Sequence, residues 1–219
     1  MKALLYKEFK LAMHPICYLF VALFPFMILI PDYPVAIGFI YVLSCYPVLF
    51  LGANKGQQSN DLLFSTLLPV RKKDIVLARL ITVMIMQFAF ILIMSALYPL
   101  ALIIPRNSNY DLGLKGFVST IAIALIGYAI ADLIFFLVYY KHGKSIVMST
   151  LLTIFGFIFH LFLFTIIIPS LPGCEWYRNI FKGEIWIQFI ILGVVLIAYF
   201  FIHLLVHKLA SKELENVDF

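Results

Sequence analysis

Long uninterrupted apolar blocks constrain the fold of this chain more than any other feature of its sequence. Six of them follow one another, at about residues 16–31, 34–53, 75–104, 116–140, 146–169 and 185–206. A helix needs about 20 apolar residues to cross a bilayer. Hydrophobic residues make up 64% of the chain and charged residues 12%, whereas soluble domains hold about 45–50% and about 25%. We therefore predict an all-α polytopic membrane protein with six transmembrane helices in a single domain, residues 1–219.

The positions of the basic residues give the predicted orientation. If the N-terminus is cytoplasmic, twelve of the sixteen Lys and Arg residues fall in cytoplasmic segments. The four that fall outside are Arg106, Lys115, Arg178 and Lys182. Cytoplasmic segments of membrane proteins carry an excess of Lys and Arg. We therefore predict a multi-pass protein of the cell (plasma) membrane with both termini in the cytoplasm.

Residues 1–14 precede the first apolar block and have a different pattern. Leu5, Phe9, Ala12 and Met13 share one helical stripe, with lysines at its side, which is typical of a helix lying on the membrane surface. A basic start followed by an apolar run is also the outline of a secretory signal. No small-x-small cleavage site precedes Pro31, and Glu8 and His14-Pro15 interrupt the apolar run, so we predict an N-terminal interfacial helix.

Charge and cysteine content argue against several other classes. The net charge is +5, but the basic residues lie between apolar blocks and not on a solvated surface, so no nucleic-acid binding is predicted. Cys17, Cys45 and Cys174 include no C-x-x-C spacing, which argues against a disulfide framework and a zinc site. His203 and His207 have no third ligand nearby in the sequence. We expect these two histidines to anchor the last helix at the cytoplasmic boundary, and we predict no metal site.

The cytoplasmic segment 54–74 is the most informative part of the sequence. Ser59 or Asn60 can cap a short helix with Asp61 in its first turn, and Pro69 ends that helix. Its large apolar residues are Leu62, Leu63, Phe64, Leu67 and Leu68. These side chains either pack on the undersides of the chain's own spans or dock into a groove on a soluble subunit.

The run from Asp61 to Val76 has the pattern D-L-L-x-S-x-L-x-P-V-x-K-x-D-I-V and lies between the second and third predicted spans. It resembles the coupling segment of ABC transporter permeases of the second exporter class (ABC-2 type). The run L-L-x-K-E-F-K at residues 4–10 is similar to the opening interfacial helix of that family. Within the family, the chain looks closest to small Firmicutes permeases that export phenol-soluble modulins or give bacteriocin or antibiotic immunity.

This resemblance implies a permease subunit of an ATP-driven exporter that is not itself an enzyme. It implies a second permease copy, as a homodimer or a closely related chain, and two copies of a cytoplasmic ABC ATPase that bind ATP and Mg²⁺. The implied ATPase-coupling residues are Asp61, Leu62, Leu63, Phe64, Leu67, Leu68 and Pro69. The implied substrate is an amphipathic peptide or a hydrophobic toxin or antibiotic. Gly143-Lys144-Ser145 is a false phosphate-loop match, because Val138 stands where the first glycine is required; we predict no cofactor and no catalytic residue in this chain.

Three polar residues inside the predicted spans are candidates for a translocation path, namely Gln87, Asp132 and His160. Such groups are costly in a membrane and are functional candidates for that reason. The structural alternative is that Asp132 pairs with a hydroxyl, amide or basic group of a neighbouring helix or of the second subunit, and that His160 is a hydrogen-bonded packing residue. Two other functions remain open, a proton- or ion-coupled secondary transporter using Asp132 and His160, and a non-transporting immunity protein that sequesters a peptide.

The external segment 170–184 is amphipathic and rich in helix breakers. Irregular backbone at membrane depth is tolerated only where it is buried in protein or faces water. In the family that the chain resembles, short re-entrant helices at this place form an outer gate, with Trp176, Tyr177 and Phe181 as the candidate residues here. An ordinary aromatic interfacial loop is the alternative.

Overall fold

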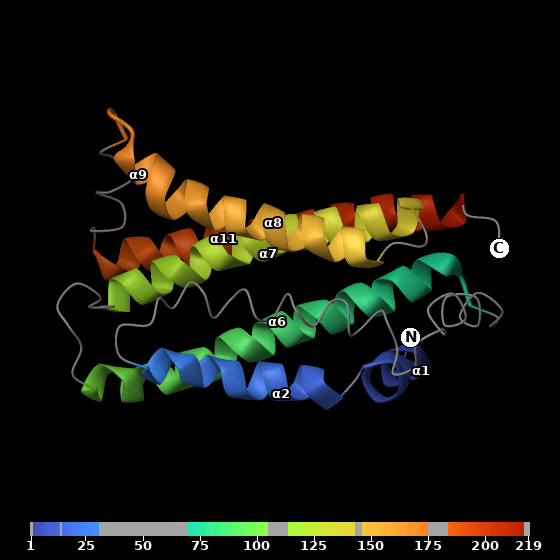
Figure 1. Cartoon of the computed structure of the whole chain (residues 1–219), viewed down its shortest axis with the longest axis horizontal. Helices are drawn as coiled ribbons and strands as arrows, with labels where there is room; N and C mark the ends of the chain where they lie inside the picture. The colour runs from blue at the N-terminus through green and yellow to red at the C-terminus, as the bar shows by residue number, and fades with distance from the viewer. Residues whose placement is uncertain are drawn as a thin grey trace.

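The computed structural model describes residues 2–13, 15–30, 70–104, 114–142, 146–174 and 184–216, and every regular element within them is a helix. Among the described residues, three helices are long and apolar enough to cross a membrane: α6 (Lys72–Ile103), α7 (Leu114–His142) and α11 (Ile185–Glu215). Figure 1 shows them side by side along the long axis of the molecule. The prediction of an all-α polytopic membrane protein is confirmed.

Two further apolar helical segments correspond to the first and fifth predicted spans. The first is α2 (Pro15–Leu23, 9 residues) continued by the 3₁₀ helix η2 (Phe24–Leu29, 6 residues). The second is α8 (Ile146–Phe162), which continues through the π-helix η4 (Leu163–Ile167) into α9 (Ile168–Ser170). The predicted second span at 34–53 lies outside the described residues.

The N-terminal segment consists of α1 (Lys2–Lys7) and the π-helix η1 (Glu8–Ala12). It is bent by 83° from the following helix, an orientation that an interfacial helix before a first span would have. Its buried side chains are Leu4, Glu8 and Met13. Met13 belongs to the predicted apolar stripe, whereas Glu8 lies outside it and is buried because a basic residue of α6 pairs with it.

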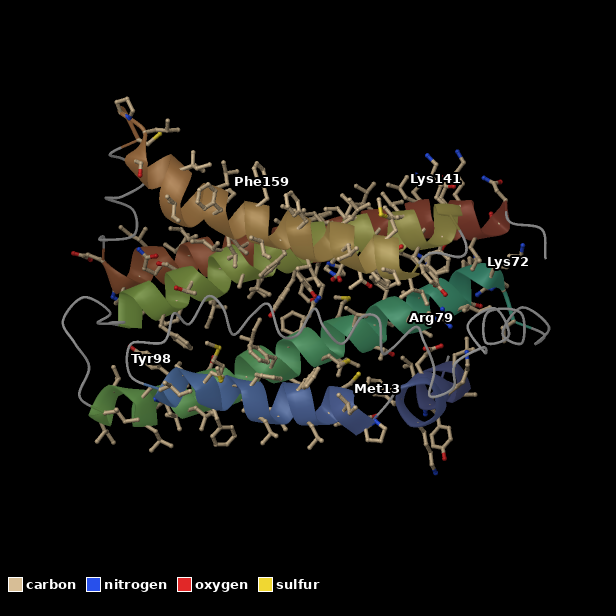
Figure 2. All side chains as sticks on the ribbon, viewed as in Figure 1. Met13, Lys72, Arg79, Tyr98, Lys141 and Phe159 are labelled. Carbon is tan, nitrogen blue, oxygen red and sulfur yellow. The ribbon has the colours of Figure 1, made fainter. Side chains whose placement is uncertain are left out.

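The ends of the helices alternate between the two ends of the bundle. Both chain termini lie at one end, where α6 begins and α7 ends (Figure 1). Lys72, Arg79 and Lys141 lie toward this same end, which we call the basic end (Figure 2). The η2 segment finishes at the opposite end, close to the end of α6 (Figure 1). Among the described helices, α7, α8 and α11 run in alternating directions (Figure 1).

The described helices pack as two groups, and the contact between α6 and α11 joins them. α7 packs against α8 and α11, while α6 packs against α11, α1 and the α2–η2 segment. The core is aromatic, and Tyr128, Phe135, Phe157 and Tyr199 are among its fully buried side chains. α6 therefore joins the N-terminal helices to the group formed by α7, α8 and α11.

Gly127 allows α8 to approach α7 closely. A Cβ atom at this position would lie 2.7 Å from Cε2 of Phe157 and 2.9 Å from Cδ2 of His160. The neighbouring Tyr128 ring stacks on Phe157, with 5.3 Å between ring centroids. Small residues at helix crossings permit this kind of close backbone contact in membranes.

We expect Gly127→Ala to destabilise the protein by about 1–3 kcal/mol, because the added methyl group overpacks a filled contact. The measurement is the unfolding midpoint of the purified protein in detergent. Gly193→Ala on α11 is the matched control, since a Cβ atom there meets nothing within 4 Å. Equal midpoints for the two variants would contradict the close-contact interpretation.

Candidate functional site

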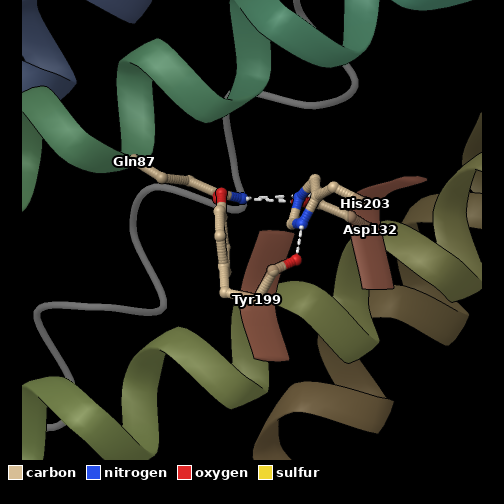
Figure 3. Close-up of polar contacts among 4 residues, drawn as sticks. All are labelled: Gln87, Asp132, Tyr199 and His203. Carbon is tan, nitrogen blue, oxygen red and sulfur yellow. Dashed lines mark hydrogen bonds and ion pairs between the residues drawn. The ribbon is translucent and has the colours of Figure 1, made fainter. Parts of the chain in front are cut away.

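Four polar side chains from three helices meet in the middle of the bundle (Figure 3). Gln87 comes from α6, Asp132 from α7, and Tyr199 and His203 from α11, and all four are buried. Gln87 Nε2 lies 3.2 Å from Asp132 Oδ1 and 3.0 Å from Oδ2. The Tyr199 hydroxyl donates to Gln87 Oε1 at 2.5 Å, and His203 Nε2 lies 2.7 Å from Asp132 Oδ2. We call these four residues the central polar cluster.

The helical spacing on α11 builds one half of this cluster. Tyr199 and His203 are four residues apart, so both side chains lie on the same face of the helix. Their ring centroids are 4.0 Å apart, and His203 Nδ1 lies 2.7 Å from the Tyr199 carbonyl oxygen. Phe88 packs edge-on against Tyr199. The imidazole is thereby held in one orientation, with Nε2 toward Asp132.

The structure brings together two of the three predicted path residues. Gln87 and Asp132 are in contact, so Asp132 has the amide partner that the structural alternative expected. His160 is separate from the cluster: its Nε2 atom bonds the Ile123 carbonyl at 3.0 Å, about two and a half helical turns along α7 from Asp132.

The expectation for His203 was wrong, because its side chain is 3% exposed and pairs with Asp132 inside the bundle. The apolar run ends near residue 206, but α11 itself continues to Glu215, which places His203 well inside the helix bundle. His207, in contrast, is at the basic end and lies 3.1 Å from the Lys73 carbonyl oxygen. The i, i+4 pair Tyr199 and His203 was the sequence signal for the missed half of the cluster.

A second polar contact joins the N-terminal helix to α6 nearer the basic end. Arg79 Nε lies 3.5 Å from Glu8 Oε1, and both side chains are 3% exposed. The Lys7 ammonium lies 3.3 Å from the same Glu8 oxygen. A carboxylate in this position requires charged partners, because an unpaired buried charge is costly. We call the contact between Glu8 and Arg79 the basal ion pair.

The first turn of α6 also binds the end of α11. Lys72 Nζ lies 3.2 Å from the Leu214 carbonyl oxygen and 3.4 Å from that of Glu215, where a cation satisfies the last carbonyl groups of a helix. Arg71 forms an ion pair with Asp74, at 2.9 Å between Nε and Oδ2. The hydrogen bond to Asp74 raises the pKa of Arg71 above its ordinary value. The start of α6 is thus fixed against α11.

Polar and aromatic contacts also occur toward the opposite end. The buried Ser119 hydroxyl of α7 donates to Gln188 Oε1 of α11 at 2.6 Å. The Tyr98 and Phe117 rings stack with 4.3 Å between centroids, joining α6 to α7.

The candidate gate residues Trp176, Tyr177 and Phe181 lie outside the described residues, as do all seven predicted coupling residues from Asp61 to Pro69. Within the described part of the chain, no group of three or more His, Cys, Asp or Glu side chains is placed to hold a metal ion.

The comparisons with known proteins agree with the arrangement of apolar helices. No curated protein and no solved structure matches this chain. A family model described as ABC-2 family transporter protein matches residues 3–207, a range that contains the central polar cluster, the basal ion pair and the predicted coupling segment. The narrower likeness to small Firmicutes permeases stays a prediction. The match covers nearly the whole sequence, and the chain therefore belongs to the ABC-2 family of transporter proteins.

Proposed function

We propose that this chain is the membrane-spanning permease subunit of an ATP-driven exporter, powered by separate ABC ATPase subunits. Membership of the ABC-2 family implies an ATPase partner in general. The observation that carries the proposal is at the start of α6. This helix begins three residues after Pro69, which ends the predicted coupling helix, and its first turns contact both α11 and the N-terminal segment.

These contacts give a path for mechanical coupling. In the proposal, two ATPase copies bind ATP and Mg²⁺ and grip the segment from Asp61 to Leu68. A displacement of that segment moves the start of α6. The start of α6 in turn moves the end of α11 through the Lys72 hydrogen bonds, and moves the N-terminal segment through the Arg79 ion pair. Farther along α6, Gln87 transmits the movement to α7 and α11 through the central polar cluster. This chain supplies the moving helices and no catalytic group.

The proposed substrate is an amphipathic peptide or a hydrophobic toxin or antibiotic. A second permease chain, identical or closely related, completes the path, with Gln87, Asp132 and His160 near its middle. Trp176, Tyr177 and Phe181 act as the outer gate. The basic end with Lys72 and Lys141 faces the cytoplasm, in keeping with the positive-inside rule, so both termini are cytoplasmic.

The test is co-purification of the permease with an ATPase subunit. We expect Leu63→Glu and Phe64→Glu to reduce the retained ATP-hydrolysing activity by more than about tenfold, because a hot-spot side chain in an apolar groove contributes about 2 kcal/mol or more. Thr66→Glu adds the same charge at a polar position of the same predicted helix and should retain the ATPase. Failure of the wild-type protein to retain any ATPase, together with unimpaired transport by Leu63→Glu, would contradict the proposal.

A proton-coupled carrier is a second candidate, and the contact between Asp132 and His203 favours it. Two titratable side chains buried together inside a membrane bundle are the groups that a proton relay uses. In this version His203 takes the role predicted for His160, which lies elsewhere. Transport by this chain alone in liposomes, driven by a pH gradient and abolished by Asp132→Asn, would establish the carrier; ATP-dependent transport without a gradient would reject it.

A further inference from the structure

The hydrogen bonds of His203 determine where its protons lie. Nδ1 is 2.7 Å from the Tyr199 carbonyl oxygen, and a carbonyl oxygen can only accept a hydrogen bond. Nδ1 therefore carries a hydrogen. The other ring nitrogen, Nε2, lies 2.7 Å from Asp132 Oδ2, and the proton between these two atoms remains to be assigned.

Nε2 and Oδ2 cannot both lack a proton at this distance. Without one, two lone pairs would face each other at hydrogen-bond range. Either an imidazolium donates to a carboxylate, or a carboxylic acid donates to a neutral imidazole. In both cases Asp132 and His203 together carry no net charge, which suits their position because a net charge inside a membrane bundle is costly.

The surroundings of the pair come from all the helices packed around it. The Tyr199 hydroxyl donates to Gln87 Oε1, so the neutral Gln87 amide turns its NH₂ group toward Asp132. Tyr128 of α7 is fully buried in the same core and stacks on Phe157 of α8. From α8, His160 bonds the Ile123 carbonyl, and Arg79 lies about two turns from Gln87 along α6, paired with Glu8. Within the described bundle, these groups leave the shared proton to Asp132 and His203.

We infer that Asp132 and His203 form a proton-binding site at the centre of the bundle. The pair binds one exchangeable proton between Nε2 and Oδ2, which are 2.7 Å apart. Release of this proton to water breaks the Nε2–H–Oδ2 hydrogen bond and leaves a carboxylate facing an imidazole lone pair. Deprotonation therefore weakens the contact between α7 and α11. This site does not depend on the ATPase partner, so the exporter proposal and this inference can fail separately.

The test compares the wild type with Asp132→Asn, whose amide donates to Nε2 and has no proton to lose. Proton release removes this contact in the wild type, whereas the amide of Asp132→Asn keeps its hydrogen bond. We expect the unfolding midpoint of the wild type in detergent to exceed that of Asp132→Asn at low pH and to fall below it at high pH. His207→Gln is the control on the same helix, and it should keep the wild-type pH profile.

Nitrogen-15 NMR of labelled histidine gives a second measurement on the wild type alone, which decides the question if Asp132→Asn does not fold. We expect the His203 Nδ1 signal to be that of a protonated nitrogen throughout, while the Nε2 signal shifts once with rising pH. His203→Gln identifies the signals by removing them. Two results would overturn the inference. One is a His203 Nδ1 without a hydrogen at neutral pH, and the other is the same dependence of the unfolding midpoint on pH in the wild type and in Asp132→Asn.

Discussion

Arg79→Ala should lower the free energy of unfolding by about 3 kcal/mol, because it leaves the buried Glu8 carboxylate with Lys7 as its remaining described partner. Breaking one side of a buried ion pair costs about 3–5 kcal/mol, and the 3.5 Å separation places this pair at the lower end. The measurement is chemical or thermal unfolding in detergent. The expected loss exceeds the effect of any single exposed charge in the chain, since exposed ion pairs contribute little.

Two further variants make this prediction specific to the basal ion pair. Arg71→Ala removes an exposed arginine that also pairs with a carboxylate, and we expect a much smaller effect. The charge-swapped double variant Glu8→Arg with Arg79→Glu should recover part of the stability lost in Arg79→Ala. Equal losses for Arg79→Ala and Arg71→Ala would show that the buried pair does not hold the N-terminal helix to α6.

His203→Leu should cost about 3–5 kcal/mol, because it leaves the Asp132 carboxylate buried without its cationic or proton-sharing partner. Adding Asp132→Asn to this variant should restore most of the loss. The asparagine removes the charge, while its side-chain oxygen still accepts from the Gln87 amide. A second substitution that stabilises the first is a direct sign of coupling between neighbouring residues.

The measurement is the unfolding free energy of the four proteins in this double-mutant cycle, at neutral pH and in one detergent. His207→Leu is the control, since His207 lies one turn farther along α11 and bonds only a backbone carbonyl of α6. Additive effects of His203→Leu and Asp132→Asn would mean that the two side chains do not interact in the folded protein.

The apolar runs were sufficient to locate most of the described spans. Predicted blocks at 75–104 and 116–140 correspond to α6 and α7, whose bounds differ from them by at most three residues. The last block was set to end at residue 206, yet α11 continues to Glu215. Beyond the apolar run, Ala210 and Leu214 are buried and Lys212 is exposed. A search for high mean hydropathy misses this extension. Its apolar residues recur with the period of a helix among polar ones, so the mean hydropathy stays low.

The partners inside the bundle were harder to predict, because they depend on how far each helix slides against its neighbours. Asp132 and Gln87 were identifiable as polar residues in apolar spans, but their mutual contact joins α6 to α7. Glu8 looked like a polar interruption in the N-terminal pattern. It is buried because Arg79, more than seventy positions away, lies opposite it, and no local pattern contains that information.

The unequal lengths of the spans have a consequence for the surrounding lipid. Nine α-helical and six 3₁₀ residues make α2–η2 only about 25 Å long, whereas the apolar part of α6, from Ile75 to Ile103, extends for about 44 Å. A hydrocarbon core of about 30 Å cannot match both helices when they stand upright. The bilayer has to thin beside α2, or the long helices have to tilt. We therefore expect acyl-chain length to act on the tilt of α6, the helix that brings Gln87 to Asp132.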